Sequence, residues 1–224
     1  MRRPGSMRGL EDLGRVRLSP NFFLRDFLYS EIADFYGIPN LPETPDLAIE
    51  VGRRLCQELL EPLQATFGRI AVRSGYRAPE VNAFGNKTGG QCASNAANAA
   101  YHIWDHLDAK GHMGAGACIV IPWFADRYAD GEDWRSLAWY LHDKLPYSHL
   151  QFFPKLAAFN IQWHEHPIRR IDSFIAPRGC LTKPGMANNG GNHGDWYRGF
   201  PALKTPAGVG FGVGTQGYGG SDGT

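Results

Sequence analysis

An apolar stripe between residues 44 and 63 constrains the fold more than any other part of the sequence. Its members recur every four residues and are Leu47, Val51, Leu55, Leu59 and Leu63, with Cys56 and Leu60 beside them. This spacing is typical of a helix that buries one face in a core. Thr44 and Pro45 are residue types that begin helices, so the helix is predicted to begin there. Pro62 lacks a backbone N–H and is expected to kink the helix or open its last turns.

Shorter patterns predict the remaining elements. Helices are expected over 26–36, ending at Gly37, and over 134–145, capped by Asp133. Apolar runs predict strands over 70–72, 117–123, 149–153 and 159–163, and residues 83–100 are predicted to be a long loop. These elements place a domain over residues 21–178. An Arg-rich arm (residues 1–20) is expected before it, and a Gly-rich tail (179–224) after it.

Composition excludes several classes of partner. The 224 residues are 43% hydrophobic and 20% charged, with a net charge of +1, so nucleic acid is not an expected partner. No apolar run is long enough for a membrane span, and the basic start lacks the apolar stretch of a signal peptide. Synthesis in the cytoplasm is expected. The four cysteines are far apart, and neither a disulfide framework nor a thiolate zinc knuckle is predicted.

The segment S-G-Y-R-A-P-E-V-N at residues 74–82 is the clearest local motif. Upstream segments match in order and spacing, namely Phe23–Phe27, Gly37–Asn40, Leu60–Leu63 and Phe67–Gly68. Together they resemble the D-Ala-D-Ala carboxypeptidase family of zinc peptidases, which shares its fold with hedgehog domains. The resemblance implies an α+β fold with helices packed on a small, mainly antiparallel sheet.

The resemblance also implies a ligand cleft. In the family, the Arg that matches Arg77 binds the terminal carboxylate of the substrate, a task suited to a planar guanidinium. The alternative is that Arg77 and Asn82 only tie the loop to the fold. The expected ligand-binding residues are Ser74, Tyr76, Arg77, Asn82, Trp163 and His164. Aromatic faces beside amide side chains are also a common way of holding sugar rings.

The metal motif of the family is incomplete in this chain. In S-x-H-x-x-G-x-A-x-D the His and Asp bind zinc; His112 matches the His, but Ile119 stands at the Asp position. In the second half of the site, Trp163 and His164 match, but Ile161 stands at the position of the acidic general base. Because isoleucine offers no donor atom, neither a metal nor catalytic residues are expected.

An alternative zinc site draws on nearby residues. His102, Asp105, His106 and Asp108 form a dense polar cluster, and on a helix His102 and His106 would share a face. His164 and His166 would share one face of a strand. This alternative has His112, His164, His102 and Asp105 as metal ligands, and His112, His164 and His166 as catalytic residues.

The expected function is therefore a non-catalytic binding or structural module that attaches to cell-envelope glycan, either peptidoglycan or surface polysaccharide. A phage-like particle is the expected setting, with the arm and the tail contacting other subunits. The alternative is an active zinc D-Ala-D-Ala carboxypeptidase or endolysin-type peptidase that cleaves peptidoglycan stem peptides.

Overall fold

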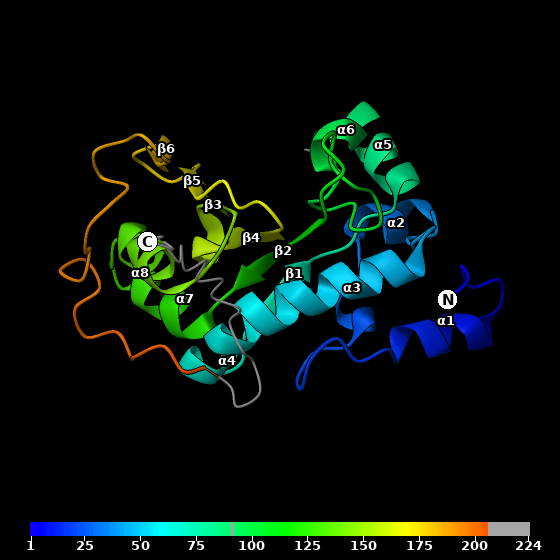
Figure 1. Ribbon diagram of the computed structural model, residues 1–224, viewed down its shortest axis with the longest axis horizontal. Coiled ribbons are helices and arrows are strands. Elements are labelled where there is room, and N and C mark those ends of the chain that lie inside the picture. The colour runs from blue at the N-terminus through cyan, green and yellow to red at the C-terminus, as the bar shows by residue number, and fades with distance from the viewer. Residues whose placement is uncertain (91, 206–224) are drawn as a thin grey trace, which may run out of the picture.

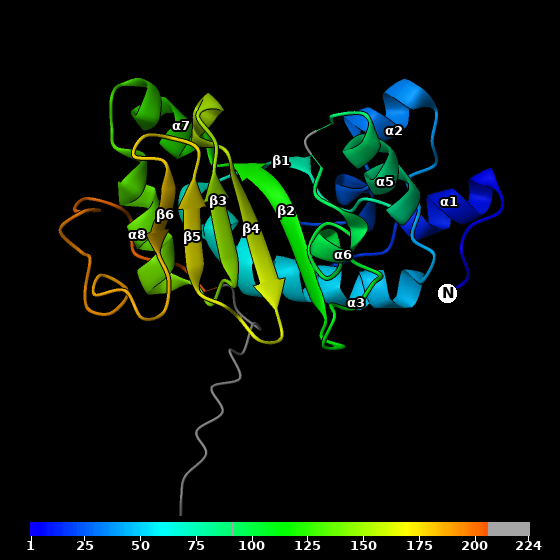
Figure 2. The ribbon, with the colours of Figure 1, turned by 90° about the horizontal axis from the view of Figure 1, so that it is seen from above.

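The chain folds around a six-stranded sheet with helices packed on one of its faces (Figure 1). The computed structural model describes residues 1–90 and 92–205. The strands are β1 (Ala71–Ser74), β2 (Gly114–Val120), β3 (His149–Phe152), β4 (Phe159–His164), β5 (Arg170–Ser173) and β6 (Gly179–Thr182). They lie in the order β1-β2-β4-β3-β5-β6, which Figure 2 shows from above. All neighbouring pairs are antiparallel except β3 and β5, which are parallel. The predicted α+β class and mainly antiparallel sheet are confirmed.

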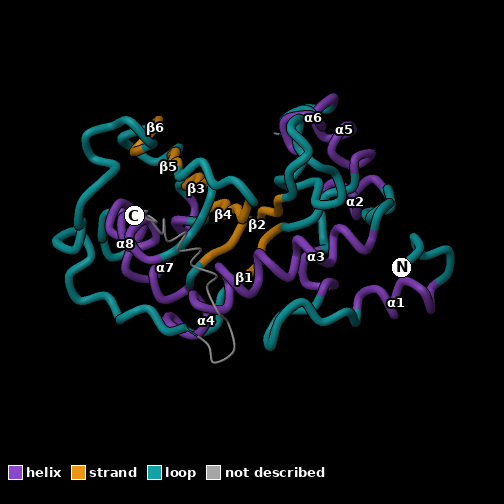
Figure 3. The backbone as a smooth tube through the Cα atoms, in the orientation of Figure 1, coloured by secondary structure: helices purple, strands orange, loops and turns teal. Residues whose placement is uncertain are grey.

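The α-helices are α1 (Met7–Gly14), α2 (Glu31–Tyr36), α3 (Pro45–Leu55), α4 (Glu61–Phe67), α5 (Pro79–Lys87), α6 (Asn95–Asn98), α7 (Pro122–Ala129) and α8 (Trp134–Lys144). The tube in Figure 3 shows α3, α4, α7 and α8 on one side of the sheet, and α2, α5 and α6 beyond its β1–β2 end. Short 3-10 turns cover Leu24–Phe27 and Lys155–Ala157. Helix α3 packs directly on β2 and β4, and α8 lies on the same side of the sheet.

The apolar stripe forms the predicted helix, and Pro62 opens it as expected. Between α3 and α4 the chain makes a π-helical turn over Cys56–Leu60, in which the Glu61 N–H donates to the Cys56 carbonyl. Because Pro62 has no N–H, the regular bond to Glu58 cannot form, and the wider turn accommodates its ring. All five main residues of the stripe except half-buried Leu47 are fully buried.

Several element boundaries differ from the predicted ones. The predicted helix over 26–36 begins only at Glu31, because the Ser30 side chain caps it by accepting from the Ala33 N–H. The predicted loop over 83–100 contains most of α5 and all of α6. The predicted strand over 117–123 begins earlier, at Gly114, and ends before Pro122, which begins α7. The sequence patterns did not predict β5 and β6.

Both ends of the described chain pack on the domain. Leu13 of α1 and Leu18 lie in the core, so this part of the expected arm is anchored. After β6, Phe200 and Leu203 pack against the core as well. The alternating Gly and Val residues of the expected tail, 208–214, lie outside the described residues.

The alternation of side chains along the strands divides the sheet into two chemically different faces. Ala117 and Ile119 of β2 and Ile161 of β4 point into the helix-covered core. Their neighbours Cys118 and Asn160 point to the opposite, more open face. The metal argument from the sequence concerned Ile119 and Ile161, and neither side chain faces the open side where a ligand has access.

Candidate functional site

A cavity of about 410 Å³ lies on the open face of the sheet. Its floor consists of one residue from each of four neighbouring strands, namely Ser74, Cys118, Asn160 and Gln151. Asn98, Tyr101 and His102 cover it from the end of α6 and from the segment between α6 and β2, which crosses the sheet. Phe153 and Phe174 form a stacked pair at its edge, with ring centroids 5.6 Å apart. No Asp or Glu from residues 1–90 or 92–205 lines the cavity.

Arg77 supplies the positive charge at this cavity. Its backbone N–H donates to the His102 carbonyl at 2.8 Å, which fixes the position of the residue. One guanidinium nitrogen donates to Asn82 Oδ1 at 3.2 Å and to Cys92 Sγ at 3.1 Å. Fully buried Asn82 in turn donates to the Ala93 carbonyl at 3.0 Å. The predicted loop tie between Arg77 and Asn82 is therefore present, and one edge of the guanidinium lies at the cavity.

The two residues above the cavity are neutral. His102 Nδ1 lies 3.1 Å from the Gly75 carbonyl, which can only accept, so Nδ1 carries the proton and Nε2 presents a lone pair. Burial, aided by the charge of Arg77, lowers the pKa of His102 to about 4. The Tyr101 hydroxyl is buried with no hydrogen-bond partner among the described residues, and burial raises its pKa. The cavity therefore offers hydrogen-bonding groups that remain uncharged at neutral pH.

A second cluster lies where β2 begins and β4 ends. Asp108 Oδ2 is 3.5 Å from His112 Nδ1 and 3.3 Å from His164 Nε2. The His166 ring lies 4.1 Å from the His112 ring, between centroids. Two segments, residues 108–112 and 164–166, thus bring a carboxylate and three imidazoles together. They lie beside a larger cavity of about 930 Å³, which His164, His166 and Trp163 help to line.

Backbone geometry holds Asp108 in its ionised form. Its Oδ1 accepts from the N–H groups of His112 and Lys110, both at 2.8 Å. The bond from the His112 N–H is the strongest cause, and together with the second bond and the nearby imidazoles it lowers the pKa of Asp108 to about 2. The His164 ring is oriented by the backbone of His166, whose N–H and carbonyl lie 3.0 and 3.1 Å from Nδ1.

The expected ligand set of the sequence analysis is split between these two places. Ser74 and Arg77 line the smaller cavity, and Asn82 supports Arg77 from below. Trp163 and His164 line the larger one, where Trp163 Nε1 donates to Glu58 at 2.8 Å. Tyr76 lies in the core against Trp104 and lines neither cavity. The expected convergence of Tyr76, Arg77, Trp163 and His164 in one cleft is not what the structure shows.

The metal set proposed as an alternative is also divided. His102 and His106 are not on a helix, because the segment from 99 to 108 has only turns, a bend and an isolated bridge between Ala99 and Ile103. Asp105 Oδ2 accepts from the N–H groups of Glu43 and Thr44, at 2.7 and 3.2 Å, and so stabilises the beginning of α3. His102 bonds to Gly75 instead, so these two residues have separate structural partners. Asp108 is the carboxylate that meets His112 and His164.

A third polar cluster was not predicted. The donor atoms of His142, Asp143 and His193 all lie within 4.8 Å of one another, and no other such set of three occurs in residues 1–90 and 92–205. The adjacent pair His142-Asp143 is visible in the sequence at the end of a predicted helix. Its partner His193 lies in a segment that was expected to be tail, so no pattern connected them.

Comparisons with known proteins identify no relative: no family model, no curated protein and no solved structure matches the chain. Among the described residues, no helix has the length and apolar character needed to cross a membrane.

Proposed function

We propose that the chain is a non-catalytic binding module, derived from the D-Ala-D-Ala carboxypeptidase fold, that attaches to cell-envelope glycan as part of a phage-like particle. One observation carries the proposal. On the open face of the sheet, the cavity that includes Ser74 and Arg77 of the S-G-Y-R motif is lined, apart from the Arg77 guanidinium, by neutral hydrogen-bonding groups. It offers no carboxylate from the described residues to activate a water molecule.

The lining of this cavity suits a polar, ring-shaped ligand. Amide groups of Asn98, Gln151 and Asn160 match hydroxyl and acetamido groups, and the stacked Phe153 and Phe174 provide an apolar edge. Arg77 adds one positive charge, which suits a carboxylate on the ligand. Peptidoglycan carries all three kinds of group, and an acidic surface polysaccharide is the other source of the same chemistry.

A co-sedimentation assay with purified peptidoglycan sacculi tests the proposal. The wild-type chain is expected to sediment with the sacculi, and Arg77→Ala is expected to weaken binding by roughly tenfold or more because a charge-assisted hydrogen bond is lost. Arg53→Ala, an exposed arginine on α3, is the matched control and is expected to bind like wild type. Tyr101→Phe, which removes one hydroxyl and no packing, tests the cavity without Arg77.

Binding to surface polysaccharide in place of sacculi, with the same dependence on Arg77, would identify the second source. No retention on either material, or equal retention of wild type and Arg77→Ala, would overturn the proposal.

A second candidate function is a zinc peptidase centred on Asp108, His112 and His164. The observation in its favour is that Asp108 Oδ2 lies 3.3–3.5 Å from a nitrogen of each imidazole, close to the spacing of ligand atoms around zinc. The three donor atoms do not all lie within 4.8 Å of one another, so the site would have to contract around an ion. Zinc there would activate water beside the larger cavity.

The same purified protein separates the two candidates. A peptidase predicts cleavage of a peptidoglycan stem peptide that a chelator abolishes, and His112→Ala should remove this cleavage. The binding module predicts sedimentation with sacculi that chelator and His112→Ala leave unchanged.

A further inference from the structure

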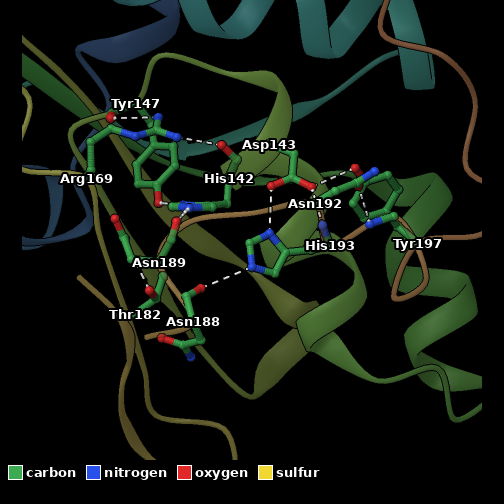
Figure 4. Close-up of polar contacts among 11 residues, drawn as sticks. His142, Asp143, Tyr147, Arg169, Thr182, Asn188, Asn189, Asn192, His193 and Tyr197 are labelled. Carbon is green, nitrogen blue, oxygen red and sulfur yellow. Dashed lines mark hydrogen bonds and ion pairs between the residues drawn. The ribbon is translucent and has the colours of Figure 1, made fainter. Parts of the chain in front are cut away.

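The last turn of α8 and the segment after β6 meet in a network of polar side chains, shown in Figure 4. His193 Nδ1 lies 2.8 Å from Asp143 Oδ1, and Asp143 Oδ2 accepts from the Tyr197 hydroxyl at 2.8 Å. His142 Nε2 lies 2.8 Å from the Asn189 carbonyl, and its Nδ1 lies 2.6 Å from the Tyr147 hydroxyl. The network therefore joins two segments that are about 50 residues apart in the sequence.

The bonds of His193 require a cation beside Asp143. Its Nε2 lies 3.0 Å from the Asn188 carbonyl, which can only accept, so Nε2 carries a proton. In a neutral ring, Nδ1 would then direct a lone pair at a carboxylate oxygen 2.8 Å away. Two lone pairs repel at this distance unless a proton or a metal ion lies between or beside them. The Nε2–H bond to a backbone carbonyl is also the usual way of orienting a metal-binding imidazole.

His142 is disposed to complete such a site. As the bonds stand, Nε2 donates to the Asn189 carbonyl, which can only accept, and Nδ1 accepts from the Tyr147 hydroxyl. To bind an ion, the ring moves its proton to Nδ1, where the Tyr147 oxygen accepts it, and Nε2 exchanges the carbonyl for the metal. Two imidazole nitrogens and one carboxylate are the protein ligands of many zinc sites.

The charges around the cluster permit a dication. Asp143 contributes a carboxylate, whose Oδ2 accepts from the Tyr197 hydroxyl. Two cationic residues, Lys144 and Arg169, line the adjoining cavity, and Arg169 donates to the backbone carbonyls of His142, Leu145 and Tyr147. A cavity of about 440 Å³ lined by His142, Asp143 and Asn192 gives solvent and ions access.

We infer that His142, Asp143 and His193 form a binding site for a divalent transition-metal ion such as Zn²⁺, and that the ion ties the segment after β6 to α8. Two of the ligands belong to α8 and the third to the segment, so a bound ion crosslinks them. This site shares no residue with the Asp108 cluster or with the cavity of the proposed function, although His142 and Asp143 also line the larger cavity beside that cluster. It stands or falls independently of the proposed function.

Isothermal titration of the metal-stripped full-length chain with ZnCl₂ tests the inference. The background is a variant with His112→Asn and His164→Asn, which removes the Asp108 cluster as a competing site. This variant is expected to bind one zinc ion. Adding His193→Gln is expected to weaken the zinc affinity by at least about 100-fold. Loss of a residue that only hydrogen-bonds to a metal ligand typically costs about 10–100-fold, and loss of a ligand itself costs more.

A second readout follows the proposed crosslink. Zinc is expected to raise the thermal midpoint of the background variant by several degrees, because it binds the folded chain and not the unfolded one. It is also expected to slow protease cleavage within residues 183–205. If His193→Gln folds poorly, Asp143→Asn replaces it as the variant that removes a ligand. Co²⁺ bound in place of zinc to the unaltered chain reports the ligand geometry through its visible absorption.

The inference is overturned if the background variant takes up no zinc. It is equally overturned if His193→Gln binds zinc as tightly as the background does, because the ion would then lie elsewhere.

Discussion

His102 shows at the scale of one residue how burial replaces the expected chemistry. The alternative metal set from the sequence included it with Asp105, but in the structure its Nδ1–H donates to the Gly75 carbonyl beside Arg77. A histidine that is close to carboxylates in the sequence does not always contact them in the fold. The hydrogen bond that decides its role comes from a residue 27 positions away, which no local spacing could predict.

This buried imidazole predicts a loss of stability in acid. Its pKa is lowered from 6.5 to about 4 in the folded chain. Between these values the unfolded chain binds a proton that the folded chain does not, so stability is full above pH 6.5 and falls as the pH drops toward 4. The shift corresponds to a loss on the order of 3 kcal/mol.

Urea unfolding at pH 7.5 and pH 4.5 measures this loss. His102→Asn keeps a donor for Gly75 but does not titrate, so its unfolding free energy should change less between the two pH values. His106→Asn, at a half-buried histidine of the same segment, is the control, and it should behave like wild type. An equal acid response in wild type and His102→Asn would contradict the assignment.

At the scale of elements, Gly114 allows the segment between α6 and β2 to pack closely against β2, because it has no side chain. A Cβ at Gly114 would lie 2.3 Å from the Ala100 carbonyl oxygen and 2.8 Å from the His164 ring. At Gly116, on the same face of the same strand, the nearest atom would be 3.4 Å away. The crossing segment is fixed at this point by bonds from the Gly116 N–H and the Gln162 amide to the Tyr101 and Ala100 carbonyls.

Gly114→Ala is therefore expected to destabilise the fold by about 2–3 kcal/mol, because a backbone carbonyl must move. Gly116→Ala is the matched substitution and is expected to cost about 1 kcal/mol or less. Chemical denaturation measures both, and the sacculus assay should show weaker binding for Gly114→Ala because Tyr101 and His102 are displaced. Equal costs for the two substitutions would contradict this account.

Elements with strong local signals were predictable, and the others were not. The α3 stripe, the Asp133 cap and the two apolar runs of β3 and β4 carry their information locally, and their existence was predicted correctly. Strand β5 contains Arg170 and Asp172 on its outer face, and it is a strand because it pairs with β3. Helix α5 begins at Pro79 in a stretch whose Asn and Gly content suggested a loop, yet its Val81 and Asn82 are buried by tertiary packing.

At the scale of the whole molecule, the described segment after β6 is part of the core. The Phe200 ring lies within 6.2 Å of the rings of Phe67, Trp123 and Tyr140, between centroids. The Tyr140 hydroxyl donates to the Pro201 carbonyl at 3.0 Å, and the Lys204 N–H donates to Thr66 at 2.9 Å. The glycine content had suggested a tail from residue 179 onward. Packing of Tyr197 and Phe200 against the core is what holds the described part of it in place.

Phe200→Ala is predicted to cost about 3 kcal/mol, since it removes a large side chain from an aromatic cluster. It should also expose residues 183–205 to proteases. Denaturant unfolding gives the first quantity and limited proteolysis the second. Trp196→Ala, at an exposed aromatic residue of the same segment, is the control and should change stability by less than about 1 kcal/mol.

The two faces of the sheet also determine where a hydrolase could be engineered. A designer who compared sequences alone would install an aspartate at position 119, where its charge would be trapped unpaired among hydrocarbon beneath the helices. Position 118, one residue earlier, lies in the floor of the cavity that Asn160 and His102 also line. An acidic side chain there would contact water and a bound ligand.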